Sequence, residues 1–162
     1  DLDAAAAAYA EMLHARARAE DHAATPSFDV LLLGVGPDGH VASLFPEHPA
    51  LYAQGSTVIG VRGSPKPPPL RVSLTMAAIR AAQDVWLVAS GTDKAAAVSL
   101  ALTGAGEYAI PAAGAQGRRR TLWLLDRAAA LVVLVRPAGV GERSDVNPGR
   151  LDGRGRLRKS GR

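Results

Sequence analysis

The residues with the clearest chemical potential are Asp38 and His40, two positions apart in the segment GVGPDGH. An imidazole has an ordinary pKa near about 6.5, so it can take a proton from water at neutral pH. A nearby carboxylate can orient such a base and stabilise its charged form. Gly36 and Gly39 leave the imidazole unshielded. The spacing predicts a general-base turn, and a His that only hydrogen-bonds the turn is the alternative.

Two cationic side chains are candidates for binding an anion such as phosphate. Lys94 begins a predicted helix after a Ser-Gly turn, and Arg71 follows the stiff segment SPKPPP, which could aim a guanidinium inward. Spacing alone favours a solvated surface side chain at both positions. The backbone N–H groups of the GVGPDGH turn could also cradle a phosphate, although its glycines do not have the dinucleotide-binding offsets.

The sequence offers little for a metal or thiol centre. Its four histidines stand at positions 14, 22, 40 and 48, and no second His or carboxylate has metal-ligand spacing relative to His40. Cysteine is absent, so there is neither a disulfide framework nor a thiolate nucleophile. We therefore expect no metal site.

Apolar strands alternating with helices must position these residues. Strands are predicted over 28–33, 57–61, 84–89 and 121–125, with an alternating segment over 71–74. Helices are predicted over 3–19, 41–45, 76–82, 94–102 and 126–130, with Thr75 as the cap of the third and Asp126 as the cap of the last. The segment 104–117 has the pattern of a flexible loop. The run of three arginines at 118–120 is interpreted as a solvated strand entry. This alternation predicts an α/β fold, Rossmann-like, with a mostly parallel sheet and flanking helices.

Length and charge suggest one domain followed by a tail. The chain has 162 residues, and 8 of its 19 basic but 3 of its 15 acidic residues lie in 136–162. That segment is rich in Gly, Arg and Pro, so we predict a domain over 1–135 and a disordered basic tail over 136–162. The nearly neutral body argues against nucleic-acid binding. Neither a membrane span nor a secretory signal is visible, and a cytoplasmic protein is expected.

Four segments together resemble the 6-phosphogluconolactonase family, which is related to the glucosamine-6-phosphate deaminases. They are LLLGVGPDGHVASLFP, SPKPPPLRVSLTMAAI, VWLVASGTDKAAAV and GRRRTLWLLDRAAA, in this order. The resemblance implies hydrolysis of 6-phosphogluconolactone to 6-phosphogluconate, in the oxidative pentose phosphate pathway, by a monomer that needs no cofactor and no metal.

The resemblance also implies roles for particular residues. His40 would be the general base that activates water, and Asp38 would orient it. Arg71 and Lys94 would hold the substrate's 6-phosphate, and backbone N–H groups from Gly36 to Gly39 would help to stabilise the oxyanion.

Two alternatives remain at this point. The deaminases carry an acidic residue a few positions after their Asp-Gly-His, whereas this chain has the apolar segment ASLFP over 42–46, which favours the lactonases. Members of the family also begin with a further strand, a Ser-Gly-Gly phosphate loop and an Asp-Glu-Arg segment, which the sequence lacks. It is therefore interpreted as N-terminally truncated, and an inactive fragment with a polyanion-binding tail is the other alternative.

Overall fold

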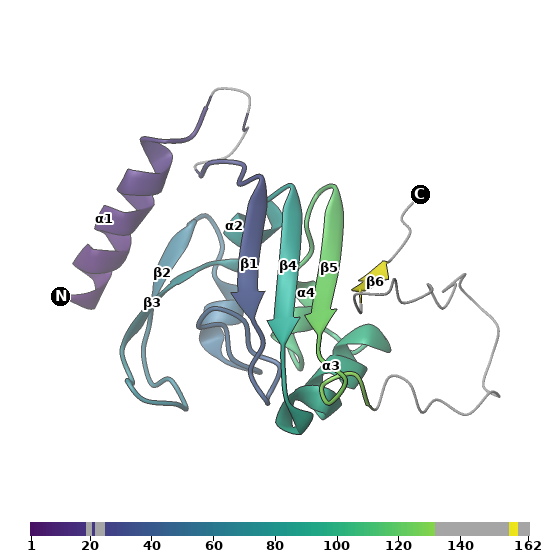
Figure 1. Cartoon of the computed structure of the whole chain (residues 1–162). Coiled ribbons are helices and arrows are strands. Elements are labelled where there is room, and N and C mark those ends of the chain that lie inside the picture. Colours follow the sequence, from purple (N-terminus) through teal and green to yellow (C-terminus); the bar gives the residue numbers. More distant parts are fainter. Residues whose placement is uncertain (19–20, 22–24, 132–155, 159–162) are drawn as a thin grey trace.

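A four-stranded sheet forms the centre of the molecule in the computed structural model, which describes residues 1–18, 21, 25–131 and 156–158 (Figure 1). The strand order is β1-β4-β5-β6. The bounds are Val30–Gly34 for β1, Asp84–Ala89 for β4, Arg120–Leu125 for β5 and Arg156–Arg158 for β6. The first three strands are parallel, and β6 runs antiparallel to β5. The predicted α/β fold with a mostly parallel sheet is confirmed.

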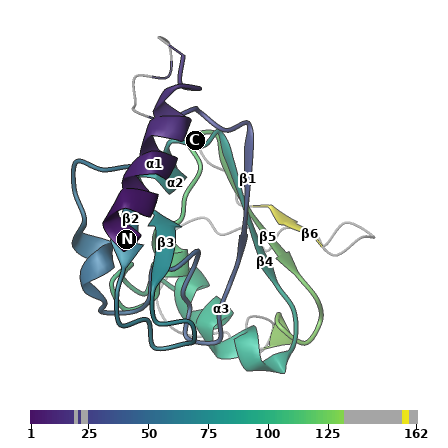
Figure 2. The same ribbon diagram turned by 90° about the vertical axis from the view of Figure 1, so that its left-hand side faces the viewer.

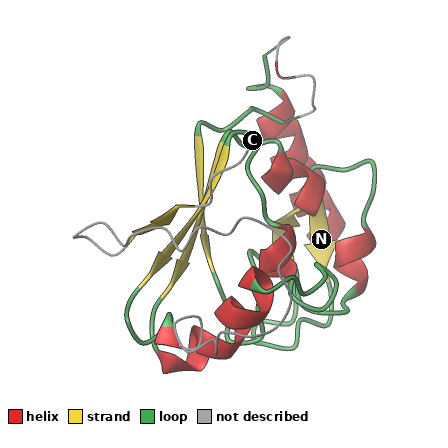
Figure 3. Cartoon of the chain, turned by 90° about the vertical axis from the view of Figure 1, so that its right-hand side faces the viewer, coloured by secondary structure: helices red, strands yellow, loops and turns green. Residues whose placement is uncertain are grey.

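The two faces of this sheet differ. Leu33 of β1 lies opposite Leu87 of β4, and Leu87 lies opposite Trp123 of β5; all three are buried in the main hydrophobic core. Figure 3 shows the helices on this side. On the other face, Leu32 is 62% exposed and Val88 is 40% exposed. Parallel sheets usually have both faces covered, so this apolar face is unusually open in the described part of the chain.

A second layer packs against the covered face. Four helices are described: α1 (Leu2–His14), α2 (Met76–Arg80), α3 (Ala95–Leu102) and α4 (Pro111–Gly114). A small antiparallel sheet is formed by β2 (Val58–Val61) and β3 (Arg71–Leu74), and α1 lies beside it (Figure 2). Ala6 and Leu13 of α1 are buried with Val58. The cap predicted at Thr75 is confirmed, since its hydroxyl accepts a hydrogen bond from the Ala78 N–H at 3.3 Å.

The prediction of a helix over 41–45 is wrong. Val41 instead forms isolated bridges with Val35 and Leu44, and Ala42 has a positive φ of 51°. The glycine turn sends the chain back alongside the end of β1, so that Val41, Leu44 and Phe45 are at most 1% exposed. Burial of these side chains in the core therefore favours a bridged turn over a helix.

Other element boundaries also differ from the predictions. The segment 104–117 contains α4, where Pro111 at the first helical turn has a suitable φ and no N–H to leave unpaired. Helix α1 ends at His14 instead of residue 19, and Asp126 caps a turn instead of a helix. The helix predicted to begin at Lys94 is preceded by the 3₁₀ helix η3 (Thr92–Lys94). A second 3₁₀ helix, η2 (Pro49–Tyr52), lies in a segment for which no element was predicted.

An ionic cluster at the start of β4 adds to the interpretation of the arginine run as a solvated strand entry, since Arg119 and Arg120 are 68% and 40% exposed and both also bind Asp84. The Asp84 side chain is fully buried, and its two carboxylate oxygens accept hydrogen bonds from Arg119 Nε and Arg120 Nε, each at 2.9 Å. The Arg119 hydrogen bond is the largest cause of the lowered pKa of Asp84; Arg120 and Trp86 act in the same direction, and burial opposes them. Two of the three arginines thus join β4 to β5.

Most of the predicted tail, 136–162, lies outside the described residues. Only 156–158 are described, as strand β6. The domain boundary after residue 135 and the disorder of the tail stay predictions.

Candidate active site

A tight turn at the carboxyl end of β1 carries the predicted Asp38 and His40. The Gly36 N–H donates a hydrogen bond to the His40 carbonyl, and the Gly39 N–H donates to the Gly36 carbonyl, each at 2.9 Å. Gly39 has a φ of 82°, which disfavours residues with a Cβ. Both of these N–H groups are therefore occupied within the turn, although they were predicted to serve an oxyanion.

The turn brings Asp38 and His40 into direct contact. Asp38 Oδ1 lies 2.6 Å from His40 Nδ1 and 3.3 Å from the His40 backbone N. Since an ionised carboxylate can only accept, Nδ1 carries the hydrogen and Nε2 is the nitrogen with a free lone pair. Burial raises the pKa of Asp38, but the hydrogen bonds from His40 outweigh it and the pKa is lowered overall. The His40 side chain is 18% exposed and the Asp38 side chain is 31% exposed, so neither is closed off from solvent.

Gly36 makes room for this pair. A Cβ at position 36 would stand 2.0 Å from His40 Nδ1 and 2.6 Å from Asp38 Oδ1, closer than any real contact. On another side, the imidazole packs on the ring of Phe45, with centroids 4.5 Å apart. The glycine and the buried Phe45 together define where the imidazole can lie.

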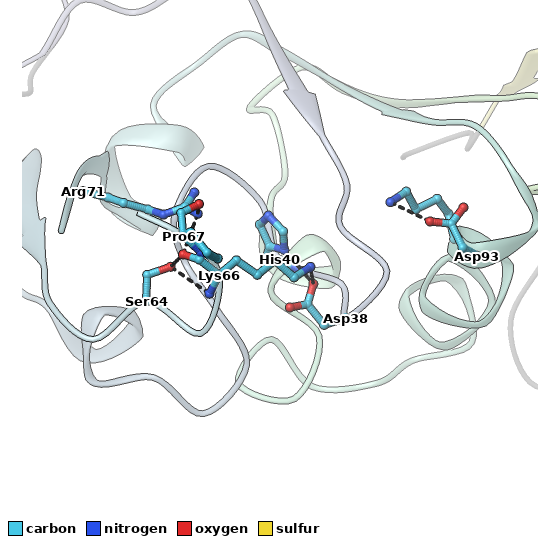
Figure 4. A network of polar contacts seen from close by, with 8 residues as sticks. Asp38, His40, Ser64, Lys66, Pro67, Arg71 and Asp93 are labelled. Carbon is cyan, nitrogen blue, oxygen red and sulfur yellow. Dashed lines mark hydrogen bonds and ion pairs between the residues drawn. The ribbon is translucent and has the colours of Figure 1, made fainter. Parts of the chain in front are cut away.

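Lys66 is a third polar side chain at this site, and no role was predicted for it from the sequence. Its Nζ lies 3.4 Å from Asp38 Oδ1. Figure 4 shows the lysine reaching toward Asp38 and His40 from the Pro-rich segment between β2 and β3. A lysine flanked by prolines was the available signal, but sequence does not show which turn the segment faces.

Arg71, at the start of β3, lies on the same side of the site as Lys66. Its guanidinium donates to the backbone carbonyls of Lys66 at 2.9 Å, Pro67 at 2.8 Å and Pro68 at 3.1 Å. Its Cζ is also 5.4 Å from the centre of the Phe45 ring. The structure therefore places Arg71 near the turn that carries Asp38 and His40, with much of its hydrogen-bonding capacity directed at the Pro-rich segment.

Lys94 lies on a different element, at the end of η3. Its Nζ is 3.0 Å from Asp93 Oδ2, and in Figure 4 Asp93 lies on the opposite side of His40 from Arg71. The turn before η3 is fixed by Asp126, whose carboxylate accepts from Ser90 Oγ at 2.8 Å and from the Gly91 N–H. The two predicted phosphate ligands thus flank the Asp38–His40 pair without touching each other.

Three further observations concern a cavity, metal ligands and membrane-spanning helices. A cavity of about 290 Å³ lies between α3, α4 and β5, but neither Asp38 nor His40 lines it. In the described ranges, no three His, Cys, Asp or Glu side chains are grouped as metal ligands. Among the helices of the described residues, none is long and apolar enough to cross a membrane.

The parallel sheet with a His-carboxylate pair at its carboxyl edge defines an α/β domain with a candidate hydrolytic site. Residues 1–123 match the family described as glucosamine-6-phosphate isomerases/6-phosphogluconolactonase. The chain belongs to this family.

Several proteins similar to this chain are named 6-phosphogluconolactonases. The chain is 69% identical to a 6-phosphogluconolactonase of Streptomyces coelicolor over 130 residues, which are 80% of this chain and 50% of the relative. It is 55% identical to that of Mycobacterium tuberculosis, covering 80% and 52% of the two chains. The solved 6-phosphogluconolactonase of Trypanosoma brucei superposes with a TM-score of 0.65 at 32% identity, covering 78% and 51%. The chain spans about half the length of the curated relatives it matches.

Proposed function

We propose that this chain carries the water-activating part of a 6-phosphogluconolactonase. The observation that carries the proposal is the 2.6 Å contact between Asp38 and His40, on a partly exposed turn of a chain that belongs to this family. The imidazole has one nitrogen occupied by a carboxylate and the other free to accept a proton, which is the arrangement a general base needs.

The reaction follows from this arrangement. His40 Nε2 removes a proton from water as the water oxygen attacks the lactone carbonyl carbon. The Asp38 carboxylate holds the ring in place and stabilises the imidazolium that forms. The bond between the carbonyl carbon and the ring oxygen then breaks, and the proton held by His40 passes to the departing alkoxide. The product is the open-chain acid, 6-phosphogluconate.

The substrate's phosphate would be bound by the cations that flank this pair. Lys94 and Arg71 are assigned to it, with charge-assisted hydrogen bonds that fix the distance between phosphate and carbonyl. The Arg71 guanidinium already donates to three carbonyls, so it would bind phosphate while still attached to the Pro-rich segment. The proposed oxyanion role of Gly36 and Gly39 would require their N–H groups to leave the hydrogen bonds within the turn.

The proposal also covers the location, the oligomeric state, the pathway and the partners of the protein. We propose a cytoplasmic monomer acting in the oxidative pentose phosphate pathway, with a sugar-phosphate lactone as its partner and with no cofactor and no nucleic acid. Gel filtration with light scattering tests the monomer, and a dimer or larger species would overturn it.

The activity is tested by following lactone loss above the spontaneous rate, with 6-phosphogluconolactone and with unphosphorylated gluconolactone. Faster hydrolysis of the phosphorylated substrate is the expected result. The same protein is then given glucosamine 6-phosphate. Ammonia release without lactone hydrolysis would contradict the proposal and favour deamination.

The residue pattern after His40 supports hydrolysis over deamination. Val41, Leu44 and Phe45 are buried in the apolar core, in the segment where the resemblance places an acidic residue in the deaminases. No carboxylate is therefore supplied by this segment to assist ring opening.

A further inference from the structure

The Lys66 side chain contacts the Asp38–His40 pair. Hydrogen bonds fix the backbone of the segment that carries this lysine. The segment from Ser64 to Pro69 contains neither helix nor strand. Ser64 Oγ donates to the Lys66 carbonyl at 2.8 Å and accepts from the Lys66 N–H at 3.3 Å. The Ser64 N–H also closes the segment by donating to the Pro69 carbonyl at 3.0 Å.

Arg71 completes this support. Its guanidinium binds the carbonyls of the three residues 66–68, so the segment is fixed from both sides. Prolines at 65, 67, 68 and 69 lower the conformational freedom that the segment loses on folding. A lysine side chain is flexible, but here its Cα is set by a braced segment directed at one carboxylate.

The other charged groups near the turn are engaged elsewhere. The Arg71 guanidinium donates to carbonyls, and Lys94 is paired with Asp93. Asp38 Oδ1 thus faces two partners, His40 Nδ1 at 2.6 Å and Lys66 Nζ at 3.4 Å. A fixed cation beside the carboxylate favours its ionised form and opposes a second positive charge on the imidazole.

We propose that Lys66 is a positioning residue: its ammonium group orients the Asp38 carboxylate, and its positive charge opposes protonation of His40, so that the imidazole is a free base at lower pH. The role deepens the proposed lactonase function and rests on it for its biological meaning. The electrostatic contact itself is measurable whether or not lactone is hydrolysed.

The test is a pH titration of the Asp38 carboxyl carbon by NMR in the 162-residue chain, with Lys66→Met, Lys66→Arg and Arg118→Met. Lys66→Met should raise the titration midpoint by about 0.2 to 0.7 pH unit, the size expected for a partly exposed ion pair. Lys66→Arg should restore the midpoint. Arg118 is exposed and precedes β5, at the end of the sheet opposite to Asp38. Arg118→Met therefore removes one positive charge away from the site and should leave the Asp38 midpoint unchanged.

Kinetics provide the second readout. If lactone is hydrolysed, Lys66→Met should move the half-maximal point of kcat/KM to higher pH, and Lys66→Arg should move it back. An unchanged Asp38 midpoint in Lys66→Met, or an equal shift in Arg118→Met, would overturn the proposal. A shifted midpoint in a protein without lactonase activity would support the Lys66 contact and count against the proposed function alone.

Discussion

Two carboxylates with lowered pKa values lie at opposite ends of the same sheet, and their surroundings differ. Asp38 stands at the carboxyl end of β1, partly exposed, with His40 as its nearest partner. Asp84 stands at the first residue of β4, fully buried, with Arg119 and Arg120 as partners. An imidazole can exchange a proton near neutral pH, whereas a guanidinium stays charged. The first pair can therefore perform proton transfer, and the second can only hold strands together.

The comparison shows that a lowered carboxyl pKa does not by itself mark an active site. The exposure of the carboxylate and the chemistry of its partner separate the two cases. Changes at the Asp38 end should therefore alter activity and leave stability nearly intact, and changes at the Asp84 end should do the opposite.

Among substitutions of residues that neighbour His40, Asp38→Asn is expected to lower the activity most. An amide can donate to His40 Nδ1, which would place the hydrogen on Nε2 and remove the free base. We expect lactone hydrolysis to fall by about 10²-fold or more, with little change in thermal unfolding. Asp29→Asn is the control, because Asp29 is exposed and precedes β1, at the opposite end of that strand from the turn that carries His40. Equal losses in both variants would contradict the role of Asp38.

A smaller loss of activity is expected for Gly36→Ala. The added methyl would overlap His40 Nδ1 at 2.0 Å, so the imidazole must leave Asp38. We expect about a tenfold or larger loss in kcat/KM, in keeping with the loss of a positioned base. Gly34→Ala is the control, since a Cβ there has nothing within 4 Å. Steady-state kinetics of both variants would distinguish them, and an active Gly36→Ala enzyme would mean that the imidazole position is not critical.

At the other end of the sheet, Asp84→Asn should affect stability. The substitution removes the buried charge that two arginines share between β4 and β5, and breaking a buried ion pair is costly. We expect the melting temperature to drop by several degrees, as measured by circular dichroism. Asp29→Asn, at an exposed position just before β1, is the control. A melting temperature equal to that of the control would show that the cluster does not stabilise the sheet.

The weakest effect is a change in stability with acid. The pKa of Asp84 is lower in the folded chain than its ordinary value of 3.8. Its contribution is therefore fully present above the pKa of the unfolded chain, and it is lost as the pH falls through the folded pKa. Denaturant unfolding from pH 6 down to about pH 3 should show this decline, and it should be smaller in Asp84→Asn. The same slope in both proteins would contradict the linkage.

The sequence predicted the parts of the fold that depend on local pattern. The apolar run of β4 predicted its bounds, and Thr75 predicted the start of α2, because burial and capping act over a few residues. The pairing of Asp38 with His40 was predictable for the same reason, since the two residues are close in sequence and meet within one turn.

Contacts between distant segments were not predictable in this way. Asp84 meets Arg119 across 35 residues only because β4 and β5 pair in one register. Lys66 reaches Asp38 because the Pro-rich segment folds back over the turn. Single-sequence patterns contain neither the register nor the direction of that segment, so the arginine run was interpreted only as a solvated strand entry and Lys66 received no role.

The most direct test of the central claim compares lactone hydrolysis by the wild-type chain with that by His40→Gln, using His14→Gln as the control from α1. Both glutamines are uncharged and cannot serve as a base at neutral pH. If His40 activates water, His40→Gln should lower kcat by about 10²- to 10⁴-fold while the melting temperature and the His14→Gln rate stay close to wild type. Hydrolysis by a folded His40→Gln protein at the wild-type rate would contradict the claim that this turn is the catalytic site.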